Sequence, residues 1–95
     1  MAFKIFYHED ALADLEEIFE WSRDRHPETT EKFADDLFNH IDLLSDFPWI
    51  GEQVKGRSST RRLFHSPLYV YYRVDEARSG IEVLSVRHTA RRRTL

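Results

Sequence analysis

The spacing of hydrophobic residues changes along this chain, and each spacing predicts a different element. A period of two over residues 3–7 is typical of a short strand. From Glu9 to about Arg25, hydrophobic residues recur every three or four positions, which predicts an amphipathic helix. His26-Pro27 interrupts it, because proline disfavours helical geometry in the preceding residue and suits the first position of a new helix. We therefore expect a second amphipathic helix from about Pro27 to roughly Asp46, antiparallel to the first.

The rest of the chain has strand-like patterns after an irregular stretch. Residues 47–59 mix glycine, serine and charge without a clear period, so we expect a loop there. Strands are expected at residues 61–65, 68–74 and 81–88, with a hairpin loop at 75–80. Alternation in the middle strand predicts one face toward the helices and one away from them. The inward set is Leu68, Val70, Tyr72 and Val74, and the outward set is Tyr69, Tyr71 and Arg73.

This order of elements predicts the fold class. The 95 residues suit a single domain, 1–95, with residues 88–95 as a basic C-terminal tail. The order β-α-α-β-β-β predicts an α+β fold with a helical hairpin packed on one face of a mostly antiparallel sheet. Trp21 and Trp49 are interpreted as core edges in preference to partner anchors. The carboxylates Asp14, Glu16, Glu17 and Glu20 are interpreted as the solvated face of the first helix.

Composition excludes several kinds of chemistry. The chain has no cysteine, which excludes disulfides and thiolate metal sites and fits a reducing compartment, so we expect the cytoplasm. No run approaches the ~20 apolar residues that span a bilayer, so no membrane association is expected. The five histidines lack metal-ligand spacing, and no glycine-rich phosphate loop is present. We expect neither a metal nor a cofactor.

Charge divides the chain into two unlike halves. Residues 1–50 hold four Lys/Arg against thirteen Asp/Glu, and residues 51–95 hold ten against four. The strand-like half is therefore basic and suits an anionic target. Arginine presents a planar fork of donors that matches carboxylate or phosphate oxygens. The candidate target-binding residues are Arg61, Arg62, Tyr69, Tyr71, Arg73, Arg87, His88 and Arg91. The alternative is that these arginines are ordinary solvated strand ends and a basic tail.

His88 also suggests a catalytic alternative. A histidine that titrates near neutrality can transfer protons in RNA cleavage while arginines stabilise the phosphorane charge. For a nuclease, the candidate catalytic residues are His88, Arg61, Arg87 and Arg91. A second acid or base would be needed, and His65 or Glu82 are the candidates beside the tyrosines. Without catalysis, Arg87 and His88 would simply form hydrogen bonds with the loop or the second helix.

An ordered set of short motifs resembles the RelE/ParE superfamily of bacterial toxins. The motifs are Ala11-x-x-Asp14-Leu15-x-x-Ile18, Pro48-x-x-Gly51, Arg62-Leu63, Tyr69-x-x-Tyr72-Arg73-Val74 and Val83-Leu84-x-Val86-x-His88-x-x-Arg91. The resemblance covers nearly the whole chain. It implies the toxin of a type II toxin-antitoxin module, neutralised by a cognate antitoxin in a hetero-oligomer, and a role in plasmid stabilization.

The superfamily divides by target, and the motifs here favour one branch. The Tyr-Arg-Val and His-x-x-Arg motifs look closer to ParE-like toxins, which inhibit DNA gyrase by binding. RelE-like toxins cleave mRNA on the ribosome, and Tyr69 stands where that branch commonly has an arginine. The resemblance therefore implies binding to gyrase, with ribosome-dependent mRNA cleavage as the alternative. A third possibility is a degenerate toxin that only binds its antitoxin and represses their operon.

Overall fold

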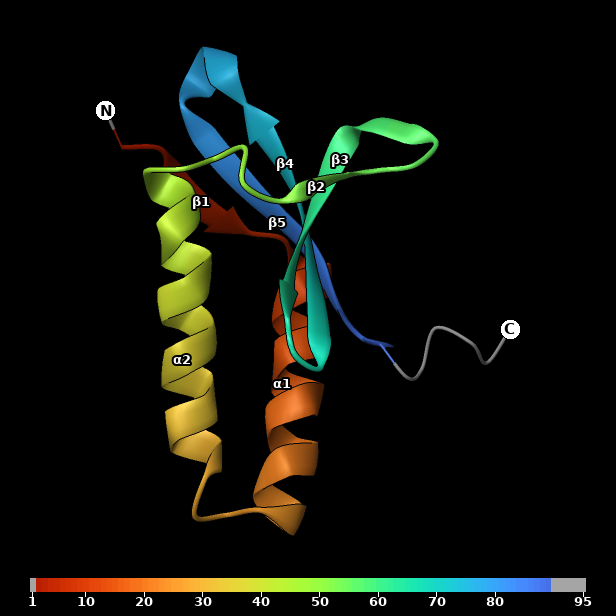
Figure 1. Ribbon diagram of the computed structural model, residues 1–95. Coiled ribbons are helices and arrows are strands. Elements are labelled where there is room, and N and C mark those ends of the chain that lie inside the picture. Colours follow the sequence, from red (N-terminus) through yellow and green to blue (C-terminus); the bar gives the residue numbers. More distant parts are fainter. Residues whose placement is uncertain (1, 90–95) are drawn as a thin grey trace.

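The fold combines two helices with one five-stranded sheet (Figure 1). The computed structural model describes residues 2–89. The elements are β1 (Lys4–Tyr7), α1 (Glu9–Arg25), α2 (Thr30–Asp42), the 3-10 turn η1 (Leu43–Ser45), β2 (Glu52–Val54), β3 (Arg57–His65), β4 (Leu68–Asp75), the 3-10 turn η2 (Glu76–Arg78) and β5 (Gly80–His88). The predicted α+β class and the helical hairpin are confirmed.

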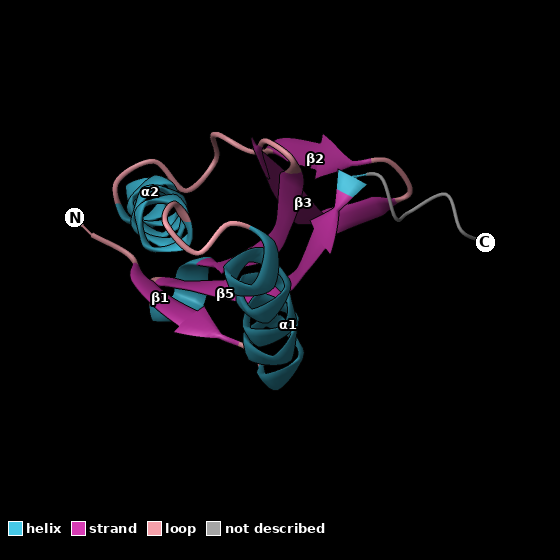
Figure 2. Cartoon of the chain, turned by 90° about the horizontal axis from the view of Figure 1, so that it is seen from below, coloured by secondary structure: helices cyan, strands magenta, loops and turns pink. Residues whose placement is uncertain are grey.

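The sheet has the strand order β1-β5-β4-β3-β2. The last three strands, β3 to β5, form the predicted antiparallel meander, and β1 pairs with β5 in parallel. Figure 2 looks along the two helices, and both contribute side chains to one core against this twisted sheet. On the opposite face, α1 reaches only the β5 edge in the described part of the chain. That arrangement leaves one face of the sheet available for function.

The core lies between the helices and the sheet. Its fully buried side chains come from both layers, and Tyr72 is the largest. The core residues are Ala11, Leu15, Leu37, Ile41, Leu44, Leu63, Leu68, Val70, Tyr72, Ile81, Val83 and Val86. The predicted inward positions of β4 are therefore buried or half-buried. Burial of apolar surface is the main stabilising contribution in a domain of this size.

A β-bulge in β5 reverses the alternation of its side chains. Tyr71 pairs with Ser85, but the next residue, Tyr72, pairs with Val83, so Leu84 has no residue opposite. The inward side chains are then at positions 81, 83 and 86 instead of following a strict period of two. This shift carries Arg87 onto the helix-free face.

The second helix is shorter than predicted. Residues 27–29 form a turn, α2 begins at Thr30 and ends at Asp42, and η1 follows. The Thr30 side chain explains the later start, because its Oγ1 donates to the carbonyl of His26 at 2.9 Å and bonds the Ser22 hydroxyl at 2.7 Å. These bonds join the two helices at the turn, so Pro27 precedes the helix instead of opening it.

The expected loop at residues 47–59 is partly wrong. It contains β2 and the first residues of β3, which pair antiparallel with a register shift between Gln53 and Val54. The segment before β2 is held by Tyr72, whose hydroxyl donates to the Pro48 carbonyl and accepts from the Gly51 amide, both at 2.9 Å. A Cβ on Gly51 would lie 2.6 Å from the Tyr72 hydroxyl, so only glycine fits this approach.

Candidate functional site on the helix-free face of the sheet

Alternation along the strands places one set of side chains on the face opposite the core. On β3 and β4, Arg62 is opposite Tyr71 and Phe64 is opposite Tyr69. On β4 and β5, Tyr69 is opposite Arg87 and Arg73 is opposite Glu82. We call this surface the outer face, defined by Arg62, Phe64, Tyr69, Tyr71, Arg73, Ser85 and Arg87. The outward orientation predicted for Tyr69, Tyr71 and Arg73 is confirmed, and the register adds Arg62 and Arg87 to them.

Aromatic rings line up across the outer face. The ring centroids of Phe64 and Tyr69 are 5.1 Å apart, and those of Tyr69 and Tyr71 are 6.2 Å apart. The Arg62 guanidinium stacks over Tyr69, with 4.1 Å from its Cζ to the ring centroid. Phe64 is 53% exposed. Rigid rings beside guanidinium groups are the side chains that dominate binding energy at protein interfaces.

The cations on the outer face differ in how they are paired. Arg62 forms an ion pair with Glu52, and Arg73 forms one with Glu82. Hydrogen bonds with Glu52 and Tyr71 raise the pKa of Arg62, and the hydrogen bond from Arg73 lowers the pKa of Glu82. Arg87 is exposed, and no carboxylate in residues 2–89 pairs with it. Arg87 therefore has charge available for a ligand.

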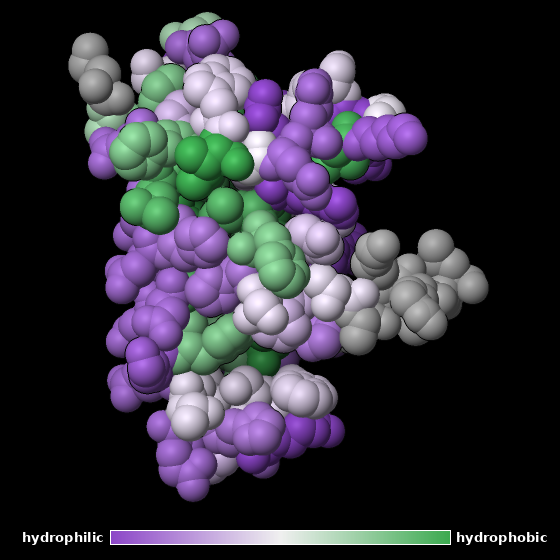
Figure 3. Space-filling model, viewed as in Figure 1, coloured by the Kyte–Doolittle hydropathy of each residue, from purple (hydrophilic) through white to green (hydrophobic). Residues whose placement is uncertain are grey.

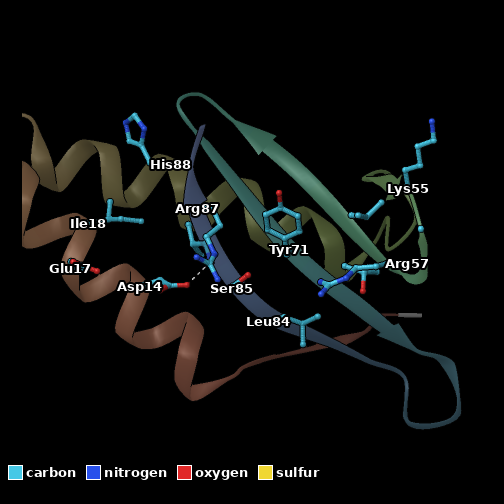
Figure 4. Close-up of a pocket in the computed structure, with 14 residues that line it drawn as sticks. Asp14, Glu17, Ile18, Lys55, Arg57, Tyr71, Leu84, Ser85, Arg87 and His88 are labelled. Atoms are coloured by element: carbon cyan, nitrogen blue, oxygen red, sulfur yellow. Dashed lines mark hydrogen bonds between the residues drawn. The ribbon is translucent and has the colours of Figure 1, made fainter. Parts of the chain in front are cut away.

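A groove of about 850 Å³ crosses the outer face beside Arg87 (Figure 4). Its floor includes Tyr71 and Ser85, and α1 forms one bank with Asp14 and Glu17. The β2–β3 turn forms the other bank and carries Lys55 and Arg57. The sequence patterns did not indicate this groove, because its banks are about forty residues apart in the sequence and meet only through the sheet.

Asp14 has a structural role that the sequence interpretation missed. Its Oδ2 accepts a hydrogen bond from the backbone amide of Val86 at 2.9 Å. β1 ends opposite Val83, so β5 continues past its parallel neighbour and Val86 lacks a strand partner on that side. Asp14 supplies the missing acceptor and is not simply part of a solvated helix face.

Arg61 lies on the other side of the sheet from Arg62. Its Nη1 donates to the carbonyls of Gly51 at 2.7 Å and Trp49 at 3.2 Å, and its Cζ lies 5.2 Å from the centre of the Trp49 ring. The two candidate residues Arg61 and Arg62 therefore do not share one surface, since successive strand residues face opposite sides. Arg61 holds the segment before β2 together with Tyr72.

The predicted acid-base residues lie in different places. His88 is the last residue of β5, pairs with Leu68 and lines the groove together with Arg87, and its ring is directed away from Tyr71 in Figure 4. Glu82 is paired with Arg73 on the outer face. His65 Nδ1 hydrogen-bonds His40 Nδ1 of α2 at 2.8 Å. Burial, followed by the neighbouring His40, lowers the pKa of His65, while Asp36 acts in the opposite direction. Arg91 lies outside the described residues.

The two tryptophans are more exposed than expected. Trp21 is 51% exposed with Arg25 stacked 4.2 Å from its ring centre, and Trp49 is 48% exposed. The interpretation of both as core edges is wrong, because neither packs against the buried core. Trp49 belongs to an apolar surface with Leu43, Phe47 and Ile50, seen as green surface near the end of α2 in Figure 3. Large exposed apolar side chains grouped in this way are typical of protein interaction surfaces.

The described residues form neither a metal site nor a membrane-spanning helix. Among residues 2–89, no three histidine or carboxylate side chains converge in a way that could hold a metal ion. No helix in the same range is long and apolar enough to cross a bilayer.

Comparison with known proteins identifies what this chain resembles. A family model described as the ParE toxin of the type II toxin-antitoxin system parDE matches residues 5–93. No curated protein matches.

Several solved structures share the fold. The chromosomal ParDE toxin-antitoxin system from Pseudomonas aeruginosa matches with a TM-score of 0.77 at 19% identity, over 92% of this chain and 96% of that one. The RelBE2 toxin-antitoxin complex from Mycobacterium tuberculosis matches with a TM-score of 0.69 at 18% identity, over 93% and 99%. The isolated RelE toxin of Escherichia coli matches with a TM-score of 0.59 at 21% identity, over 92% and 84%. At these identities the likeness shows the fold.

Proposed function

This chain belongs to the ParE toxin family of type II toxin-antitoxin systems, and from that premise we propose that it inhibits DNA gyrase by binding. In this proposal the outer face is the target-binding surface. Arg62, Tyr69, Tyr71 and Arg87 make the contacts, and Arg73 supports them through its pair with Glu82. The toxin acts in the cytoplasm and is not itself an enzyme.

The combination of arginines and aromatic rings on the outer face carries this proposal. Arg62 and Arg87 share the outer face with aromatic rings, whereas His65 is bonded to His40 on the helix side. His65 is therefore not placed for proton transfer to a ligand on the outer face, a step that ribonuclease chemistry needs within hydrogen-bond reach. The same rings and guanidinium groups suit a protein interface without any chemical step.

The proposal includes a cognate antitoxin as the second partner. The ParDE and RelBE2 neighbours are toxin-antitoxin systems, which supports a neutralising protein for this chain as well. An exposed apolar surface at Leu43, Phe47, Trp49 and Ile50 supports a stable protein partner, because such surfaces are costly to leave in water. The toxin would then be held in a hetero-oligomer until the antitoxin is lost.

A supercoiling assay tests the target. We expect purified chain to inhibit DNA gyrase and to trap it on cleaved DNA, and we expect the inhibition to be lost in Arg87→Glu but kept in Arg78→Glu. Arg78 is a matched control because it is an exposed arginine of η2, outside the outer face. Normal supercoiling with the toxin in excess would reject gyrase as the target. Codon-positioned cuts in transcripts, in a translation reaction with the same protein, would establish the ribosome-dependent nuclease instead.

A further inference from the structure

The end of β5 that carries Arg87 has a strand on one side only. β4 pairs with β5 to its last residue, where Leu68 lies opposite His88, whereas β1 pairs with it only as far as Val83. Within residues 2–89, the final residues of β5 therefore have no strand beside them on the β1 side. A strand end of this kind is fixed by one ladder of hydrogen bonds instead of two.

The β-bulge at Leu84 interrupts that one ladder at the point where β1 ends. Val83 is the last residue of β5 opposite β1, and Leu84, which has no residue opposite in β4, follows it directly. A bulge bends its strand and increases the local twist. The residues beyond the bulge, 85–88, would therefore be free to change their angle to the rest of β5 if the β4 ladder alone held them.

α1 provides a second attachment. Oδ2 of Asp14 accepts a hydrogen bond from the Val86 amide at 2.9 Å, drawn as the dashed line in Figure 4. A hydrogen bond to an ionised carboxylate is roughly twice as strong as one between neutral groups. The helix is itself fixed here, because Ala11 and Leu15, which lie before and after Asp14, are buried in the core. The bond therefore ties the end of β5 to a rigid element.

Arg87 follows Val86 directly, and its own side chain has no partner that would direct it. It forms no side-chain hydrogen bond or ion pair within residues 2–89. Arg62, in contrast, is held by its ion pair with Glu52. The position of the Arg87 guanidinium therefore depends on the backbone that carries it, and the bond from Val86 to Asp14 fixes that backbone.

We infer that Asp14 is a positioning residue for target binding, because its bond to the Val86 amide sets the angle at which β5 presents Arg87 on the outer face. The inference rests on the proposed function, which gives Arg87 a target to contact. Asp14 acts through the backbone, since the oxygen that accepts the bond is directed at β5. Loss of this carboxylate moves a donor whose hydrogen bonds weaken steeply as their geometry worsens, so it weakens target binding by way of Arg87 alone.

A double-mutant cycle tests whether Asp14 acts through Arg87. The four proteins are the unmodified chain, Asp14→Ala, Arg87→Ala and the variant with both changes, and the readout is the toxin concentration that halves gyrase supercoiling. We expect Arg87→Ala to weaken inhibition about tenfold and Asp14→Ala about threefold or more. The double variant should be as weak as Arg87→Ala, within about twofold, because no arginine remains to be positioned, whereas independent effects would multiply.

Two further variants separate the hydrogen bond from charge and from a general loss of stability. Asp14→Asn removes the charge but keeps an acceptor oxygen, so it should inhibit within about twofold of the unmodified chain. Tyr72→Phe loses buried hydrogen bonds to the segment before β2, on the other side of the sheet from Arg87, and should also keep its potency. All variants are compared at a temperature where circular dichroism shows each of them to be folded.

Amide hydrogen exchange gives a readout that needs no target. In Asp14→Ala, the Val86 amide should exchange at least about tenfold faster, a larger acceleration than that of the β4 amides. A general loss of stability would accelerate all of these amides by the same factor. Asp14→Asn should keep most of the protection of the Val86 amide, because the acceptor oxygen remains.

Any of three results would overturn the inference. They are effects of Asp14→Ala and Arg87→Ala that multiply in the double variant, an Asp14→Ala protein that inhibits as well as the unmodified chain, and a Val86 amide accelerated no more than the β4 amides. An unmodified chain that leaves gyrase active would reject the proposed target alone, and the same cycle is then measured on growth arrest after induction. A gyrase inhibitor whose two effects multiply would reject the positioning role alone.

Discussion

Asp14 of α1 accepts a hydrogen bond from the backbone amide of Val86, although the two residues are 72 positions apart. The bond lies where β5 extends past the end of β1 and needs an acceptor from outside the sheet. It also fixes the end of β5 that carries Arg87, and it places the acidic α1 bank beside the groove. One carboxylate thus links the helix layer to the proposed binding surface.

Replacing Asp14 should lower the stability of the fold, and more so when the new side chain has no oxygen to accept the hydrogen bond of Val86. Asp14→Ala leaves the partly buried amide of Val86 without a partner, and we expect a loss of about 1–3 kcal/mol in the free energy of unfolding. Asp14→Asn keeps an acceptor oxygen and should lose less. Urea unfolding measures both, with the exposed Glu16→Ala as the control for removing a carboxylate from the same helix. Equal stability of Asp14→Ala and the unmodified chain would show that the bond contributes nothing.

The hydroxyl of Tyr72 should stabilise the fold by holding the segment before β2 in place. Tyr72→Phe removes the partner of the buried Gly51 amide and of the Pro48 carbonyl without changing the ring that packs in the core. We expect a loss of about 1–3 kcal/mol, because a buried donor is left unsatisfied. Tyr69→Phe provides a matched control on the outer face of the same strand. Thermal unfolding should show a clearly larger drop for Tyr72→Phe, and equal drops would contradict the role of the hydroxyl.

The sequence predicts the long, regular elements well. It predicts poorly the short elements that depend on pairing with distant parts of the chain. The predicted span of α1 is the observed Glu9–Arg25, because its three-to-four spacing runs unbroken to His26-Pro27. β2 was missed because it has three residues and begins with the polar Glu52-Gln53, so no alternation is visible. Its strand geometry depends on pairing with β3, a tertiary interaction that overrides weak local preference.

Only part of the candidate site was predictable, because alternation can be read from one strand whereas the register between strands cannot. Alternation shows that Arg61 and Arg62 face opposite sides, and the core pattern of β4 shows which side is free of helices. The register between strands, which brings Arg62 over Tyr69 and Arg87 beside it, is not encoded in any one segment. The bulge at Leu84 further shifts the face of Arg87, and the bonds of Asp14 and His65 join residues distant in sequence.

The His40–His65 pair should make stability depend on pH below neutrality. Only one Nδ1 in the 2.8 Å contact can carry the shared proton, so protonating both rings breaks the bond and places two positive charges together. The pKa of His65 is lowered from 6.5 in the folded chain, so the unfolded chain binds protons first as the pH falls. The stabilising contribution is therefore complete above pH 6.5 and is lost as the pH falls through the lowered folded-state value.

Unfolding in urea at a series of pH values between 8 and 5 measures this effect. His40→Gln keeps a hydrogen-bonding side chain but removes the imidazole beside His65, so its stability should fall less steeply with acid than that of the unmodified chain. His26→Gln, at an exposed histidine next to α1, should leave the slope as it was. A steep slope that persists in His40→Gln would show that other groups cause the pH dependence.

The outer face should be required for toxicity but not for folding. Tyr69→Ala removes the ring under the Arg62 guanidinium and the centre of the aromatic row, and we expect at least a tenfold loss of inhibitory potency, the scale of an interface residue worth more than about 1.4 kcal/mol. Phe6→Ala is the control, since Phe6 is an exposed aromatic residue on the edge strand β1, which β5 separates from β4. Growth arrest after induction measures the toxicity of the two variants, and soluble yield and thermal unfolding measure whether they fold. A Tyr69→Ala protein that folds and arrests growth as strongly as Phe6→Ala would exclude the outer face as the target-binding surface.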